Sequence, residues 1–390
     1  MEIAVANRIQ GTKEYYFSKK LREVELLNKS GKKIINLGIG SPDLMPPTRA
    51  IEKLCIAVGE ECNHGYQSYK GIPALREAYA QFYASHYQVE VDPEKEILPL
   101  IGSKEGIIHI SMTYVNEGDE VLVPNPGYPA YAAATQMAGG KTIIYDLEQT
   151  NGWIPNLDKI SQKDLTKVKL MWVNFPNMPT GAKGNTSFFQ ELIQFGKEHN
   201  ILICNDNPYS FILNDNPQSL LSVPEAKDVA IELNSLSKSH NMAGWRMGVL
   251  IGKEVHIQNV LRFKSNMDSG MFLPVQLAAV EALQSSKEWF EDLNKVYKER
   301  RNKVWEILDS LECTYDREQT GLFVWAKAPE HIDNVEAFVD EVLYNGRVFI
   351  TPGFIFGSNG ERFVRISLCN KVEVLEEALD RVQSLKQVAK

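Results

Sequence analysis

Short apolar runs alternate with amphipathic segments through the middle of the chain. Runs rich in aliphatic and β-branched residues predict strands at residues 96–102, 120–124, 141–146, 169–175, 201–206, 229–237 and 247–252. Between several of them, apolar positions recur at helical spacing, as at 73–87, where Leu75, Tyr79 and Tyr83 share one face. This alternation predicts an α/β fold in which helices cover both faces of a mostly parallel sheet.

A longer amphipathic stretch follows at residues 286–311, with apolar side chains such as Leu293, Val304 and Leu308 at helical spacing. We expect this helix to carry the chain from the large part of the fold into a smaller α+β unit near the C-terminus. The chain has 390 residues, more than one simple hydrophobic core accommodates, so more than one domain is expected.

Charge and cysteine usage narrow the class of protein. A formal net charge of −8 and a pI near 5.6 argue against a surface that binds nucleic acid or anionic lipid. The five cysteines are scattered, without a C-x-x-C pair or a histidine at metal-ligand spacing, so we expect a reducing compartment and no metal site. The N-terminus lacks the apolar core of a signal peptide, and no apolar run approaches the ~20 residues that cross a bilayer. We therefore expect a cytoplasmic protein that binds neither membrane nor nucleic acid.

The stretch SLSKSHNMAGWRMG (235–248) carries the strongest chemical signal. Lys238 lies just beyond a strand-like run that contains Ser235 and Ser237, and Arg246 follows eight positions later. Hydroxyls and a guanidinium bind phosphate, and nearby positive charge lowers the pKa of an amine, which favours a Schiff base to a phosphorylated aldehyde. Taken alone, the same pattern also fits a solvated loop lysine beside a surface arginine.

Asp206 ends the strongly apolar run ILICND (201–206), where open α/β sheets bind ligands. A buried carboxylate requires a cationic partner. The pyridine nitrogen of pyridoxal phosphate (PLP) is one, and its protonation makes the ring an electron sink. Tyr209, three positions on, could donate a hydrogen bond to the ring's phenolic oxygen. An aspartate that caps a following helix is the alternative for this motif by itself.

Two glycine-containing motifs add binding groups. GSKEGI (102–107) follows a strand and opens a helical pattern, so the backbone N–H groups of Ser103 and Lys104 would form an anion site. The rigid loop VPNPGYPAY (123–131) holds Tyr128, on which an aromatic cofactor could stack. A packed loop tyrosine is the simpler alternative for that residue.

Two further motifs offer groups for a carboxylate. FVRISLCN (363–370) alternates as a strand does and places Arg365 among apolar neighbours, where its charge requires an anion. A substrate α-carboxylate can meet the guanidinium with two hydrogen bonds, although a structural salt bridge explains the residue equally well. LGIGSPD (37–43) is typical of a turn at a strand end, in which Gly40 lets the backbone approach a ligand closely.

In this combination and order, the motifs resemble the class I and II aminotransferases of the fold-type-I PLP superfamily over nearly the whole chain. The most specific are S-x-S-K followed by G-x-R-x-G, D-x-x-Y at a strand end, and P-T-G before that strand. The resemblance implies a large PLP-binding domain at 49–285 and a small α+β domain made of both chain ends, with an N-terminal arm and part of this domain in 1–48 and the rest in 286–390. It also implies a homodimer with shared active sites, in which Tyr66 of one subunit reaches the PLP phosphate of the other.

The resemblance further implies a role for each site residue. Lys238 forms the Schiff base with PLP, Asp206 pairs with the pyridine nitrogen and Tyr209 bonds the phenolic oxygen, while Tyr128 stacks on the ring. The phosphate is held by Ser103, Lys104, Ser235, Ser237 and Arg246, and the substrate carboxylate by Gly40 and Arg365.

One motif departs from the family's pattern. The family usually has an asparagine directly before the proline of P-T-G, where it bonds the phenolic oxygen. In NFPNMPTGA (174–182), Met178 has that position and Asn177 lies one residue earlier. A thioether offers no hydrogen-bond donor. Either Asn177 reaches the cofactor from a shifted loop, or Tyr209 bonds the phenolic oxygen alone.

These residues predict an aminotransferase that moves the amino group of an L-amino acid to a 2-oxo acid, with 2-oxoglutarate as the expected acceptor and ping-pong kinetics. Arg365 favours a substrate that keeps its α-carboxylate, but a C–S or other β-lyase of the same fold stays open. A PLP-sensing transcription regulator would need a DNA-binding domain before the first motif, and we expect none because that motif begins at residue 37. A nicotinamide enzyme would need a G-x-G-x-x-G motif that opens a βαβ unit, which we do not find.

Overall fold

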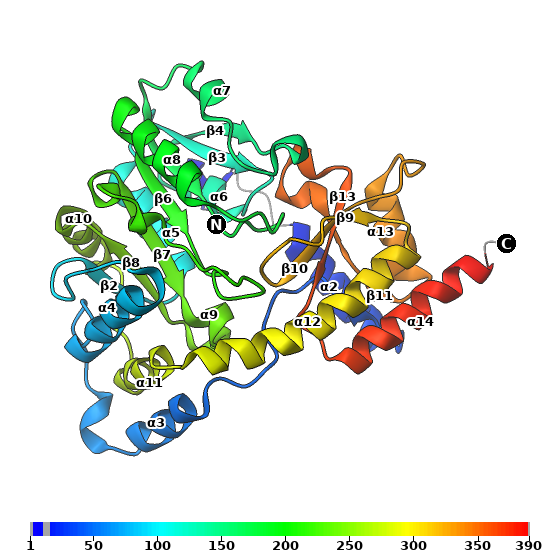
Figure 1. Cartoon of the computed structure of the whole chain (residues 1–390), viewed down its shortest axis with the longest axis horizontal. Coiled ribbons are helices and arrows are strands. Elements are labelled where there is room, and N and C mark those ends of the chain that lie inside the picture. Colours follow the sequence, from blue (N-terminus) through cyan, green and yellow to red (C-terminus); the bar gives the residue numbers. More distant parts are fainter. Residues whose placement is uncertain (1–2, 11–15, 389–390) are drawn as a thin grey trace.

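The computed structural model of the chain describes residues 3–10 and 16–388. A seven-stranded sheet with the strand order β2-β8-β7-β6-β5-β3-β4 forms the centre of the larger part (Figure 1). Its strands are β2 (Ile97–Leu100), β3 (Glu120–Asn125), β4 (Lys141–Asp146), β5 (Val168–Val173), β6 (Leu202–Asp206), β7 (Ala230–Ser235) and β8 (Gly248–Gly252). Strand β8 runs antiparallel to β2 and β7, and the other pairs are parallel. The predicted α/β fold with a mostly parallel sheet is confirmed.

Helices cover both faces of this sheet because its strands bury both rows of side chains. The helices of the larger part are α3 (Thr48–Val58), α4 (Pro73–Tyr87), α5 (Ser103–Tyr114), α6 (Ala130–Met137), α7 (Leu157–Ser161), α8 (Thr186–His199), α9 (Leu236–Ser239), α10 (Glu254–Lys264) and α11 (Leu273–Leu283). Along β5, Leu170 and Trp172 pack in one buried cluster with Ile110 of α5, whereas Met171 packs in another with Phe189 of α8. Successive residues of a strand point to opposite faces, so a strand buried on both faces is a continuous apolar run.

The smaller part is built from both chain ends. Strand β1 (Ile35–Asn36) pairs parallel with β11 (Val348–Phe349). A four-stranded sheet has the order β12-β13-β10-β9. Its strands are β9 (Thr314–Tyr315), β10 (Phe323–Lys327), β12 (Thr351–Pro352) and β13 (Phe363–Ser367), and the helices beside it are α2 (Tyr16–Lys29), α13 (Val335–Tyr344) and α14 (Val372–Val388). The expected α+β unit made of both chain ends is therefore present.

Helix α12 (Lys287–Ser310) runs from the larger part into the smaller one, as the amphipathic stretch 286–311 predicts (Figure 1). Domain divisions after residues 48 and 285 stay a prediction, and residues 1–2 and 11–15 of the expected N-terminal arm lie outside the described residues. Within the described part of the chain, no helix combines the length and apolar character that a membrane span requires.

The strand predicted at 229–237 is too long. Strand β7 ends at Ser235, and Lys238 lies in the short helix α9 that follows directly. The hydroxyl of Ser235 accepts a hydrogen bond from the backbone N–H of Ser237 at 3.1 Å, which caps the new helix and ends the strand. The lysine is therefore held on a turn of helix at the carboxyl edge of the sheet.

A fully buried carboxylate joins two strands that lead into this edge. Glu232 on β7 accepts hydrogen bonds from Tyr83 Oη (2.9 Å), Asn205 Nδ2 (2.8 Å) and Ser219 Oγ (2.9 Å). Burial raises the pKa of Glu232. Because Asn205 lies on β6, the network fixes the end of β6 relative to β7.

Replacing Glu232 by alanine should lower the free energy of unfolding by about 3 kcal/mol or more. Several buried donors would lose their acceptor, and each costs about 1–3 kcal/mol. Glu232→Gln should destabilise less, because one carboxamide oxygen still accepts. Urea unfolding measures both, with Glu330→Ala as the control, since that exposed residue pairs with Lys327 at the surface. An unchanged unfolding free energy in Glu232→Ala would contradict the importance of this network.

Candidate active site

A cavity of about 380 Å³ lies at the carboxyl edge of the seven-stranded sheet, where residues of β10 and β13 face it. All the residues that the sequence predicts for the site line this cavity, except Asn177 and Tyr66. The predicted residues that line the cavity are Gly40, Ser103, Lys104, Tyr128, Asp206, Tyr209, Ser235, Ser237, Lys238, Arg246 and Arg365. The fold thus brings motifs from the whole length of the chain into one space.

Asp206 supplies a buried negative charge at the end of β6. Its Oδ2 accepts a hydrogen bond from Tyr131 Oη at 2.9 Å, while its buried Oδ1 has no hydrogen-bond partner among the residues that the structure describes. Burial raises the pKa of this carboxyl to about 6, although the bond from Tyr131 opposes the rise. The ring of Tyr131 is itself fixed by stacking on Trp172, with 5.0 Å between centroids. An open, buried carboxylate oxygen suits a protonated ring nitrogen.

The start of α5 offers a site for an anion. Its N-terminal cap is Gly102, at φ +82°, and no side chain caps the helix. A Cβ at Gly102 would lie 2.0 Å from Arg246 Nη2, so glycine is required for the guanidinium to approach the turn. Ser235 and Ser237, whose hydroxyls lie 2.8 Å apart, line the same cavity. Helix N–H groups, hydroxyls and an arginine together suit a phosphate.

The amine of Lys238 lies between the cavity and the loop that carries Gly40. Its Nζ donates a hydrogen bond to Gly40 O at 2.6 Å. Burial lowers the pKa of Lys238, and the positive charges of Arg365 and Arg246 act in the same direction. A lysine amine with a lowered pKa is a nucleophile and a proton acceptor.

Arg365 is held by aromatic and backbone groups. Its Cζ lies 3.8 Å from the ring centroid of Phe323 and 4.6 Å from that of Phe356. Its Nη2 donates to Gly38 O at 2.9 Å, and its Nη1 lies 3.2 Å from the sulfur of Met178. Two aromatic faces keep the guanidinium in one plane, which favours two-point binding of a carboxylate.

Two predicted residues are not in the cavity lining. The carboxamide oxygen of Asn177 accepts hydrogen bonds from the N–H (3.2 Å) and the hydroxyl (2.8 Å) of Thr180, so this side chain stabilises its own turn. Met178 lines the cavity instead. The shifted loop that would bring Asn177 to the cofactor is therefore not the arrangement found. Tyr66 is 93% exposed in the single chain, outside the cavity.

Sequence reasoning missed two polar residues that line the cavity. Tyr131 bonds Asp206, and the only signal for it was a second tyrosine one helical turn after Tyr128. Asn174 donates from Nδ2 to the backbone oxygen of Asp206 and accepts from Met178 N at 2.7 Å. Its signal was a polar residue directly after a buried strand. Both fix the groups around the end of β6.

A polar cluster outside the cavity joins α5 to the segment that follows α10. Ligand-type atoms of Glu105, His109 and Asp268 come within 4.8 Å of one another, although the sequence predicts no metal site. The buried amine of Lys264 lies 2.7 Å from Asp268 Oδ2 and 2.9 Å from its Oδ1. This lysine already supplies a cation to the aspartate.

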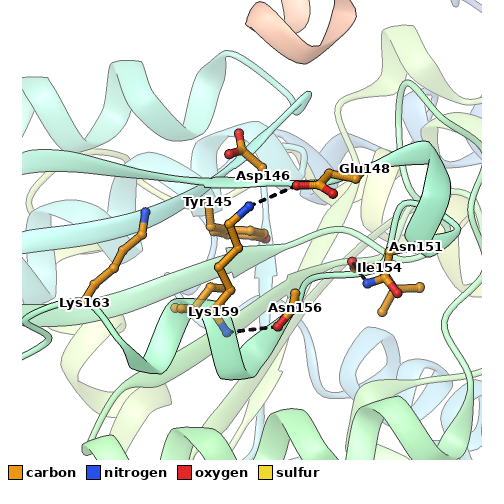
Figure 2. A pocket seen from close by; sticks show the side chains of 9 residues that line it. Tyr145, Asp146, Glu148, Asn151, Ile154, Asn156, Lys159 and Lys163 are labelled. Carbon is orange, nitrogen blue, oxygen red and sulfur yellow. Dashed lines mark hydrogen bonds and ion pairs between the residues drawn. The ribbon is translucent and has the colours of Figure 1, made fainter.

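A smaller pocket of about 110 Å³ lies beside β4 and α7 (Figure 2). Of its two lysines, Lys159 pairs with Glu148 at 3.0 Å, and the backbone N–H of Lys159 donates to Asn156 Oδ1 (Figure 2). None of the residues predicted for the site lines it. The larger cavity is therefore the candidate active site.

The groups in that cavity fit PLP. Asp206 Oδ1 is an unpaired acceptor for a pyridine N–H, the start of α5 is open to a phosphate, and Lys238 has an amine for an aldehyde. A lysine, a buried aspartate and an anion-binding helix start at the edge of a mostly parallel sheet define the class of fold-type-I PLP enzymes.

The chain belongs to the class I and II aminotransferase family, whose model matches residues 32–382. The LL-diaminopimelate aminotransferase of Dehalococcoides mccartyi strain CBDB1 is 39% identical, over 98% of this chain and 99% of that protein. The LL-diaminopimelate aminotransferase of Natranaerobius thermophilus is 41% identical, over 97% of this chain and 98% of that protein. The substrate-bound structure of BacF from Bacillus subtilis superposes with a TM-score of 0.93 at 39% identity, over 99% of this chain and 98% of that one. The predicted class, a PLP-dependent aminotransferase, is confirmed.

Replacing Asp206 by asparagine should stabilise the cofactor-free protein at pH 7. The pKa of the carboxyl is raised from 3.8 to about 6 in the fold, so the folded state of the wild type loses stability as the pH rises from 4 to 6. Two pKa units correspond to at most about 3 kcal/mol. Urea unfolding of variant and wild type at pH 4 and pH 7 measures the gain, which should be present only at pH 7. Asp228→Asn, a change at a surface ion pair with Lys253, should bring no such gain.

The hydrogen bond to the phenolic oxygen of PLP should come from Tyr209 and not from Asn177. Losing the tyrosine hydroxyl in Tyr209→Phe should raise the pKa of the Lys238–PLP Schiff base by about one unit, because a hydrogen bond to the phenolate favours the deprotonated form. Met178→Asn should lower it, since a donor is added. Asn177→Ala should leave it unchanged. A spectroscopic pH titration of the three variants checks this, and a raised pKa in Asn177→Ala would overturn it.

Proposed function

We propose that this aminotransferase uses 2-oxoglutarate as its amino acceptor and Lys238 as the group that takes the Cα proton from the amino donor. The observation that carries this proposal is the placement of one amine. Lys238 Nζ lines the cavity together with Asp206 and Arg365, so it lies among the groups suited to the cofactor ring and to the substrate carboxylate. Its lowered pKa supports a role as general base, since a larger share of the amine is unprotonated at neutral pH.

Residues on the cofactor side have binding roles in this proposal. When bound, PLP withdraws electrons from the bonds at the substrate's Cα. Asp206 holds a proton on the pyridine nitrogen through Oδ1, while Tyr131 keeps its carboxylate from turning and Asn174 bonds its backbone oxygen. Tyr128 packs against the ring, while Tyr209 donates to the phenolic oxygen. The phosphate is held by Ser103, Lys104, Ser235, Ser237 and Arg246.

On the substrate side, Gly40 and Arg365 form the carboxylate-binding pair. Arg365 binds the α-carboxylate, and the backbone at Gly40 approaches it because no Cβ intervenes. A Cβ at Gly40 would lie 2.1 Å from the ring of Phe323. Because one pair serves both the amino acid and the 2-oxo acid, the two substrates bind in turn, which is the basis of ping-pong kinetics.

For the amino donor, LL-diaminopimelate is the first candidate, because it appears in the names of the curated relatives. A panel of L-amino acids with 2-oxoglutarate as acceptor tests this choice. Transfer from LL-diaminopimelate with the highest kcat/KM of the panel would support it, and a higher value for another donor would replace it.

We also propose a homodimer in the cytoplasm. Tyr66, Met267 and Phe272 are exposed apolar side chains. Their segments pack together, since a Cβ at Gly270 would lie 2.4 Å from Gln67 O. Such a patch is typical of a protein interface, and Tyr66 would extend from it to the partner's phosphate. All five cysteines are free, which agrees with a reducing compartment.

Lys238→Ala should keep PLP through the phosphate contacts and lose transamination by about a thousandfold or more, because both the Schiff base and the general base are removed. In the wild type, mass spectrometry after borohydride reduction should find the phosphopyridoxyl group on the peptide that contains Lys238. Lys253→Ala is the matched control, because Lys253 pairs with Asp228 at the surface. Labelling of another lysine would show that the site is assigned wrongly.

A further inference from the structure

The segment from Leu37 to Met45 passes along the cavity, which Gly40 lines, and is hydrogen-bonded to both parts of the molecule. In the smaller part, Ser367 N donates to Leu37 O at 2.8 Å, and Arg365 Nη2 donates to Gly38 O at 2.9 Å. In the larger part, Lys238 Nζ donates to Gly40 O at 2.6 Å. The segment therefore contacts both Lys238, the proposed base, and Arg365, the residue proposed to bind the substrate carboxylate.

One buried arginine that does not line the cavity binds this segment through Asp43. Arg300 of α12 is 2% exposed. Its Nη1 lies 2.6 Å from Asp43 Oδ1 and its Nη2 lies 3.0 Å from Asp43 Oδ2. The same Nη1 donates to Leu368 O at 3.1 Å, three residues after Arg365. A single guanidinium thus bonds the segment that carries Gly40 and the chain that leaves β13.

We propose that Arg300 and Asp43 are positioning residues that set the spacing of the carboxylate-binding pair, Gly40 and Arg365. A planar guanidinium with two parallel bonds to a carboxylate fixes both distance and angle. Neither residue lines the cavity, so both act through the groups that they hold. The inference rests on the proposed role of Gly40 and Arg365.

A purely structural ion pair would behave differently from a positioning pair. Its loss would weaken the fold and the binding of PLP and substrate together. Loss of a positioning pair should weaken substrate binding alone, because the proposed phosphate ligands lie on α5, at the end of β7, on α9 and in the turn before β8. A misplacement of about 1 Å can cost a hundredfold in rate, so small shifts of the segment suffice.

The experiment uses Asp43→Asn, which removes the charge, and Arg300→Lys, which keeps the charge but cannot make two parallel bonds. Arg301→Lys is the matched control. Arg301 is the next residue on α12, bonds Gln319 O at 3.1 Å and lies 4.8 Å from the Trp305 ring, away from residues 37–45. The probe is α-methyl-L-glutamate, which binds as the product amino acid does but has no Cα hydrogen to lose. The cofactor's absorption reports its dissociation constant, and PLP affinity is measured separately.

Both variants should raise the dissociation constant of the probe between about tenfold and a hundredfold. PLP affinity should stay within about twofold, and Arg301→Lys should match the wild type. The double variant should be no weaker than the weaker single variant, since both changes break one interaction. An unchanged dissociation constant in either folded variant, or an equal loss of PLP affinity, overturns the proposal.

Folding is checked by circular dichroism. If Asp43→Asn does not fold, Asp43→Glu replaces it, since the charge remains while the carboxylate moves by one methylene, and the same rise in the dissociation constant is expected. If the wild type transfers no amino group to 2-oxoglutarate from any donor, the proposed function fails, and this inference with it. If the wild type is active and the variants bind the probe normally, only the positioning role fails.

Discussion

A buried carboxylate that the protein satisfies only in part determines how this site works. Asp206 has Tyr131 on one oxygen and, among the described residues, no partner on the other. Removing such a charge from water is unfavourable, and the raised pKa expresses that penalty. Tyr131, held by Trp172, and Asn174, bonded to the backbone of Asp206, keep the carboxylate in place. A protonated ring nitrogen would supply a partner for this oxygen, which is why the buried carboxylate fits PLP.

Positive side chains line the same cavity as this carboxylate at two places, near the start of α5 and on strand β13. Lys104 and Arg246 line the cavity near the start of α5, and Arg365 lines it from β13. A ligand with a phosphate at one end and a carboxylate at the other matches this arrangement. Lys238 lies among these charges, and together with burial they lower the pKa of its amine. Two of the cations that suit such a ligand, Arg365 and Arg246, thus also lower the pKa of the lysine.

The cavity exists only because the two parts of the molecule are held together. Its walls come from β6 and α9 in the larger part and from β10 and β13 in the smaller part. The segment 37–45 and the Arg300–Asp43 pair link the parts next to the substrate side, where α12 passes between them (Figure 1). The cavity therefore depends on both parts, because Arg365 comes from the smaller part and the start of α5 from the larger one.

The sequence by itself determined the elements and the charged residues of the site. Strand β4 and helix α4 have their predicted bounds, because side-chain direction repeats locally along a strand or helix. Asp206 and Arg365 were predicted because a charge beside an apolar run requires a partner, and Lys238 because the hydroxyls and the arginine near it in sequence suit a phosphorylated aldehyde. The tertiary structure decided which distant groups hydrogen-bond to one another. Tyr131 bonds a residue 75 positions away, and Arg300 one 257 positions away. It also decided that Asn177 bonds Thr180 while Met178 faces the cavity. A hydrogen bond depends on which atom lies opposite, and packing of distant segments sets that position.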